Sequence, residues 1–146
     1  MTNYPEKPIW NDDMKFKSAT IIALQAFKAQ YPYKIGYEKR KEGLQALNRA
    51  LDSVYGRNVV LDFHSPELED SFQSHYDRLT DTITMVGKLS IITYLHEYAH
   101  ALGKDEYGAV KWSLSLFKRV YPIAFEKLNP LNHCMVSLED HCMVSV

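Results

Sequence analysis

The sequence predicts an α+β domain in which two helices precede a small sheet and two further helices follow it. Apolar residues recur every three or four positions in four segments, and this is the period of an amphipathic helix. Between the second and third of these segments the chain is rich in β-branched and aromatic side chains, as strands are. Helices and strands in separate runs favour an α+β architecture. The four helical segments are residues 12–30, 37–55, 88–102 and 105–120.

Length and composition fit a single soluble domain. The chain has 146 residues, of which 46% are hydrophobic and 24% are charged, enough to build one proper core. A formal net charge of −1 provides no field that would attract nucleic acid or an anionic membrane, so neither partner is expected. There is no 18-residue apolar run and no apolar signal region at the start of the sequence. We therefore expect a cytoplasmic protein.

The first two helices have recognisable ends. Tyr31 precedes Pro32, and the residue before a proline disfavours the helical conformation, so the first helix stops there. The second helix ends before Gly56, which suits a left-handed C-terminal cap. The apolar stripe of the second helix consists of Leu44, Leu47, Leu51 and Val54.

Two segments predict the sheet. Residues 58–65, NVVLDFHS, read as one strand that Ser65 and Pro66 bring to an end. Residues 74–88 predict a hairpin or a pair of short strands, of which TITMV at 82–86 is the clearer, with Gly87 after it. The sheet is expected to be antiparallel or mixed.

The last two helices are separated by a short turn. The third helix ends at Gly103, and the fourth begins near Asp105 and ends before Pro122. The expected buried stripe of the third comprises Ile91, Ile92, Leu95, Ala99 and Leu102. The expected inner face of the fourth comprises Ala109, Val110, Ser113, Leu116, Phe117 and Val120.

The third helix carries the pattern H-E-x-x-H at residues 96–100. His96 and His100 are four positions apart, so a helix places both on one face, where two imidazoles can bind one zinc ion. Glu97 projects about 100° around the helix from His96, which puts its carboxylate beside the metal. There it can act as the general base toward a zinc-bound water.

A helix with two hydrogen-bonded core histidines and no metal is the simpler interpretation of the same residues. Two imidazoles one turn apart, with a glutamate between them, favour the metal site over that interpretation. A catalytic zinc ion normally has three protein ligands and an open position for water. Glu106 and Asp105 are the candidates for the third ligand. Glu106 has the longer reach, whereas Asp105 is better placed as the N-cap of the following helix, so Glu106 is favoured.

These residues resemble the zincin metallopeptidases. The segment ITMVGKLSIITYLHEYAHALG, residues 83–103, is similar to their strand and active-site helix, and EYGAVKW, residues 106–112, resembles the glutamate helix of gluzincins. The length fits the small minigluzincin-like members. The resemblance covers about residues 74–120. It implies a zincin-like fold, zinc held by His96, His100 and Glu106, Glu97 as the general base, and an edge strand at 82–86 that holds an extended substrate.

The spacing departs from the usual gluzincin pattern. Five residues separate His100 from Glu106, whereas gluzincins usually have a longer insertion. The metzincins have a comparable spacing with His or Asp in place of the glutamate, and Met135 or Met143 would then have to form their methionine turn. That family ranks second, because its members are mostly exported.

Two further features have no assigned role. Oxyanion stabilisation usually needs another donor near the metal, and the candidates His75, Tyr76 and Tyr94 all fit ordinary structural roles as well.

Residues 133–146, HCMVSLED followed by HCMVSV, form a short tandem repeat. Its His-Cys pairs are poor geometry for a second metal site, so we expect a domain at 1–132 and a C-terminal tail with little structure.

The sequence thus predicts a zinc-dependent peptidase that holds one zinc ion per chain, acts on a peptide or protein and uses Glu97 to activate the zinc-bound water. The alternative is a zincin-fold, metal-binding regulatory or interaction module with little hydrolytic activity. The intact Glu97 favours the peptidase, because a module that only binds has no need of a base at that position.

Overall fold

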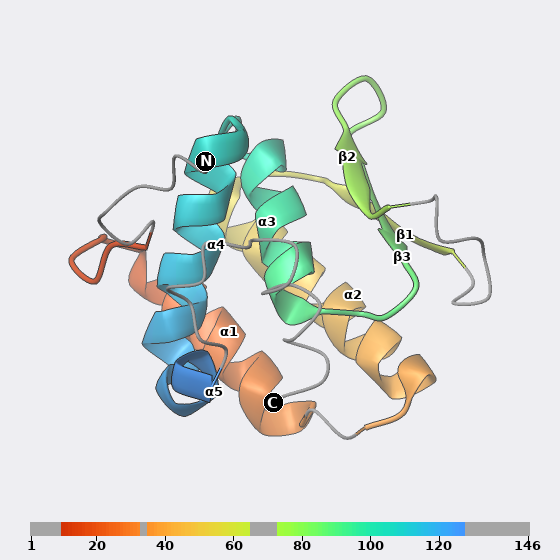
Figure 1. Cartoon of the computed structure of the whole chain (residues 1–146). Helices are drawn as coiled ribbons and strands as arrows, with labels where there is room; N and C mark the ends of the chain where they lie inside the picture. Colours follow the sequence, from red (N-terminus) through yellow and green to blue (C-terminus); the bar gives the residue numbers. More distant parts are fainter. Residues whose placement is uncertain (1–9, 33–34, 65–72, 128–146) are drawn as a thin grey trace, which may run out of the picture.

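A computed structural model describes residues 10–32, 35–64 and 73–127 of the chain. In this part of the chain helices pack against a three-stranded sheet, and the α+β class is confirmed (Figure 1). The elements in chain order are α1 (Ser18–Gln30), α2 (Tyr37–Tyr55), β1 (Val60–His64), β2 (His75–Asp77), β3 (Thr82–Val86), α3 (Ile91–Ala101), α4 (Glu106–Val120) and α5 (Pro122–Lys127).

The start of the first helix differs from the prediction. Helix α1 begins at Ser18 instead of near residue 12. The preceding residues are held against α4: the Asn11 amide donates to the Ser115 hydroxyl at 2.8 Å, and Arg119 donates to the Met14 carbonyl at 2.9 Å. The bond from Arg119 uses the Met14 carbonyl, which a longer α1 would have paired within the helix.

The sheet is mixed, and its strand order is β1-β3-β2. Strand β3 pairs in parallel with β1 and antiparallel with β2, so residues 75–86 form the expected hairpin. The expectation that residues 82–86 form an edge strand is therefore wrong, because β3 lies at the centre of the sheet and pairs with a strand on each side. The edge strand of the hairpin is β2.

One face of the sheet supports helix α3. The register places Leu61, Tyr76 and Ile83 side by side across the three strands, and Phe63 beside Met85 in the next row. Ile83 and Met85 belong to the hydrophobic core, and the other three side chains pack against it. Helix α3 contacts β2, β3 and α4, while α2 lies against α1 and β1 (Figure 1). The sheet and the neighbouring helices thus fix α3 from several sides.

Most of α3 is buried, and polar bonds as well as apolar contacts hold it. The hydroxyl of Tyr94 donates to Asn48 Oδ1 at 2.7 Å, and Asn48 Nδ2 donates to the Val59 carbonyl at 2.8 Å. The hydroxyl of Tyr98 donates to Asp52 at 2.9 Å. Because buried polar groups need defined partners, these bonds fix the rotation of α3 relative to α2.

The C-terminal part of the described chain contains a helix that the sequence did not predict. Pro122 predicts a stop for the preceding helix, and α4 does end at Val120. Pro122 is also the first residue of α5. A proline is well suited to the first position of a helix, because the amide it lacks has no helical partner there.

The predicted tail with its tandem repeat, residues 133–146, lies outside the described residues, as do Met135 and Met143. None of the described helices is long and apolar enough to cross a lipid bilayer.

Candidate metal centre

The site is built by α3, the turn after it and the first residue of α4. Ser90 caps α3, and its hydroxyl accepts from the Thr93 amide at 3.2 Å. Gly103, with φ of 94°, reverses the chain after α3, a conformation that favours glycine. The Lys104 amide then bonds back to the Ala99 carbonyl at 3.1 Å. This tight turn brings the start of α4 beside the last turn of α3.

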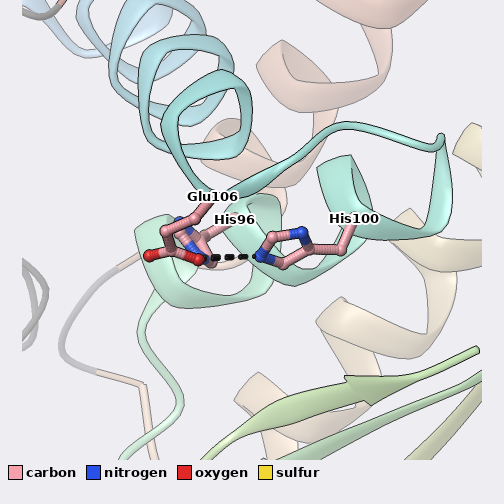
Figure 2. A group of neighbouring side chains, drawn as sticks. All are labelled: His96, His100 and Glu106. Carbon is pink, nitrogen blue, oxygen red and sulfur yellow. Dashed lines mark hydrogen bonds and ion pairs between the residues drawn. The ribbon is translucent and has the colours of Figure 1, made fainter.

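The donor atoms of His96, His100 and Glu106 converge on one point (Figure 2). The two Nε2 atoms are 3.2 Å apart, and Glu106 Oε1 lies 3.1 Å from His96 Nε2 and 3.0 Å from His100 Nε2. A tetrahedral ion with bonds of about 2.0–2.1 Å separates its donor atoms by roughly 3.3 Å. The three side chains could therefore hold a metal ion with only small adjustments.

The hydrogen bond made by Nδ1 of His100 indicates whether its other ring nitrogen, Nε2, presents a lone pair to the cluster. Nδ1 lies 2.9 Å from the carbonyl oxygen of Lys104, and a carbonyl can only accept, so Nδ1 carries a proton and donates. In the neutral ring Nε2 then has a lone pair, which points at the carboxylate oxygen of Glu106. Two acceptors at 3.0 Å need a cation or a proton between them. The role of the Lys104 carbonyl could not have been predicted from sequence, since any residue supplies the same group.

Burial favours the neutral form of the His96 imidazole. The side chain of His96 is 7% exposed, and desolvation lowers its pKa below the ordinary value, despite the opposing effect of Glu106. A neutral imidazole is the form that binds metals. The side chains of Glu106 and His100 are 75% and 24% exposed, so the centre is accessible to solvent.

The structure separates the two candidates for the third ligand. Asp105 is the N-cap of α4, and its Oδ1 accepts from the Gly108 amide at 2.7 Å. Glu106, the first residue of α4, carries the carboxylate that reaches both imidazoles. Asp105 thus has the capping role that the sequence favoured for it, and Glu106 is the acid that joins the cluster that could hold a metal ion.

Replacing Asp105 with alanine is expected to destabilise the fold by about 1 kcal/mol, because the Gly108 amide loses its capping acceptor. Metal binding should be retained, since Glu106 is unchanged. Urea unfolding and metal content by elemental analysis, measured on the same preparation, would check both parts. Metal loss in a folded Asp105→Ala chain would instead make Asp105 a ligand.

Glu97 lies inside α3, next to the first histidine. The residue is 8% exposed and buried with most of that helix. Its position in the chain lies about 100° around the helix from that of His96.

Two of the three candidates for an oxyanion donor are engaged elsewhere. The hydroxyl of Tyr76 donates to Asp81 at 2.6 Å, and that of Tyr94 donates to Asn48. His75 is exposed on β2, where its Nδ1 lies 2.9 Å from the Gln73 carbonyl. Structural roles therefore account for both tyrosines.

Comparisons with family models, with curated proteins and with the solved structures returned no match to this chain. The fold and the three converging side chains are accordingly the basis for assigning a function.

Proposed function

We propose that the chain is a zinc-dependent peptidase of the zincin type. The convergence of His96, His100 and Glu106 carries this proposal, together with the lone pair that the Lys104 carbonyl directs to the centre. Two imidazoles and one carboxylate form a ligand set that suits zinc better than calcium or magnesium, which prefer oxygen ligands.

The open side of the centre supports a catalytic role over a purely structural one. Structural zinc sites are closed by four protein ligands, whereas catalytic sites have three and admit water or substrate. Within the described residues three side chains form the cluster, and the one on α4 is largely exposed. The ligand that α4 contributes is thus accessible to solvent.

Four side chains and one backbone carbonyl have defined tasks in the proposed reaction. When bound, zinc supplies a Lewis acid and lowers the pKa of a coordinated water to about 7. Glu97 accepts a proton from the attacking water and returns it to the nitrogen of the departing amine. His96, His100 and Glu106 hold the ion, and the bond from His100 to the Lys104 carbonyl fixes the orientation of that ring.

The substrate class we propose is an extended peptide, bound along the edge of β2. Helix α3 contacts this strand, and in the described part of the chain only β3 pairs with it. An unpaired strand edge offers amides and carbonyls that can add one more strand. Strand β2 thus takes the substrate-holding position that the sequence analysis gave to residues 82–86.

The proposal is tested by incubating zinc-loaded full-length chain with a mixed library of quenched fluorescent peptides. Cleavage is expected, it should stop with a chelator, and it should return when zinc is added. A zinc-loaded, folded chain that cleaves none of the peptides, and no unfolded protein substrate either, would favour the metal-binding module.

A further inference from the structure

A second polar cluster connects the β2–β3 hairpin to the end of α3. Arg57 follows α2, and its guanidinium donates from Nη1 to the Ala101 carbonyl and from Nη2 to Asp81 Oδ1, the latter at 2.6 Å. The Tyr76 hydroxyl donates to the same Asp81 oxygen at 2.6 Å. One carboxylate and one guanidinium therefore join three separate parts of the chain.

The positions of these groups explain what the cluster holds. Tyr76 is the middle residue of β2, and Asp81 lies in the turn just before β3. Ala101 is the last residue of α3, directly after the metal-site residue His100. Carbonyls at the end of a helix lack helical partners, and a cationic side chain there also offsets the partial negative charge of the helix end.

The backbone at Asp81 has an uncommon conformation that hydrogen bonds support. Asp81 has a φ of 53°, a left-handed conformation that L residues rarely adopt. Its carbonyl accepts from the Val60 amide at 2.9 Å. The hydrogen bond from Tyr76, with that from Arg57, holds the pKa of the Asp81 carboxyl below its usual range, so the carboxylate is charged at neutral pH.

We propose that Arg57 is a positioning residue that sets the distance and angle between the substrate edge of β2 and the metal site. The inference rests on the proposed function, because it assumes that an extended peptide pairs with β2 beside the zinc ligands. Arg57 touches none of the three ligands, and its contact with β2 is through the side chain of Tyr76. Its effect passes through Asp81 and Tyr76 to β2, and through Ala101 to the last turn of α3.

This arrangement predicts a specific kinetic signature. Arg57→Ala leaves the zinc ligands and Glu97 in place, so zinc content and kcat should stay within about twofold of the unaltered chain. A hairpin that is no longer fixed to α3 should pair less well with peptide, so KM should rise. We expect a rise of about tenfold, which corresponds to the loss of hydrogen bonds to a charged group. Tyr76→Phe should shift KM in the same direction by a smaller factor.

Two further variants separate positioning from general stability. Arg57→Lys keeps the charge but lacks the planar fork that reaches two acceptors, so it should restore KM only in part. Arg119→Ala removes another arginine that binds backbone carbonyls, those of Asp12 and Met14, and it should leave KM unchanged. Equal effects of Arg57→Ala and Arg119→Ala, or a loss of zinc in Arg57→Ala, would overturn the proposal.

Hydrogen exchange measured on the same zinc-loaded chains tests the connection without relying on activity. Arg57→Ala should accelerate exchange both in β2 with the following turn and at the amides after α3, while α1 is unaffected. Acceleration at only one of the two places would overturn the proposed connection. If the unaltered chain cleaves nothing but both places respond, the connection is supported and the peptidase assignment is the part that fails.

Discussion

Replacing His100 with alanine is expected to lower bound zinc from about one ion per chain to nearly none. The change removes one of three converging donors and the ring whose lone pair the Lys104 carbonyl orients. Glu106→Gln should have a similar effect, because an amide lacks the negative charge that offsets the metal. Elemental analysis of untagged protein, purified without chelator, measures the result directly.

A matched control for this experiment is His75→Ala. His75 is an exposed histidine on β2 that lies outside the cluster, so its loss should leave zinc content unchanged. Zinc should also raise the melting temperature of the unaltered chain and have no such effect on His100→Ala, since only the native site binds the ion. A folded, unaltered chain that contains no zinc and takes up none would leave only two neighbouring histidines and their glutamate partner.

Glu97→Gln is expected to abolish most of the hydrolysis while zinc stays bound. The amide has nearly the shape of the carboxylate but cannot accept a proton at neutral pH, so general-base catalysis is lost. Removing such a group typically lowers the rate about 10²- to 10⁴-fold. The variant should be measured beside the unaltered chain on whichever library peptide is cleaved fastest, at equal zinc content.

A comparison of Glu97→Gln with Glu106→Gln distinguishes loss of the general base from loss of a metal ligand. Both remove one carboxylate within the α3–α4 unit, but only the second should release the metal. Full hydrolytic activity in zinc-loaded Glu97→Gln would exclude Glu97 as the base and require another proton acceptor. Simultaneous loss of zinc and activity would place Glu97 among the groups that hold the site together.

The sequence predicted the helical part of the structure well because its signals are local. Helix α2 has the expected bounds, with Gly56 in the left-handed conformation at its end. The inner face of α4 is buried as its periodicity indicated. Predictions were less accurate where the outcome depends on distant residues. The late start of α1 results from bonds to Ser115 and Arg119, about a hundred positions further along the chain.

The position of a strand within the sheet likewise depends on distant residues, and here it affects the proposed substrate site. Residues 82–86 have strong strand character whether they lie at an edge or at the centre, because that character depends on the side chains alone. Their position was decided by parallel pairing with β1 and antiparallel pairing with β2. The proposed substrate edge therefore moved from β3 to β2, a change that nothing in the segment itself indicated.

The sequence by itself determined that this protein has an amphipathic helix with two histidines one turn apart, a glutamate between them and two acids just beyond a glycine turn. Only the tertiary structure decided which acid completes the cluster, which carbonyl orients His100 and which strand of the hairpin lies at the edge of the sheet. The physical reason is that helical periodicity and capping act over a few residues. By contrast, the convergence of donor atoms depends on how α3, α4 and the β2–β3 hairpin pack together.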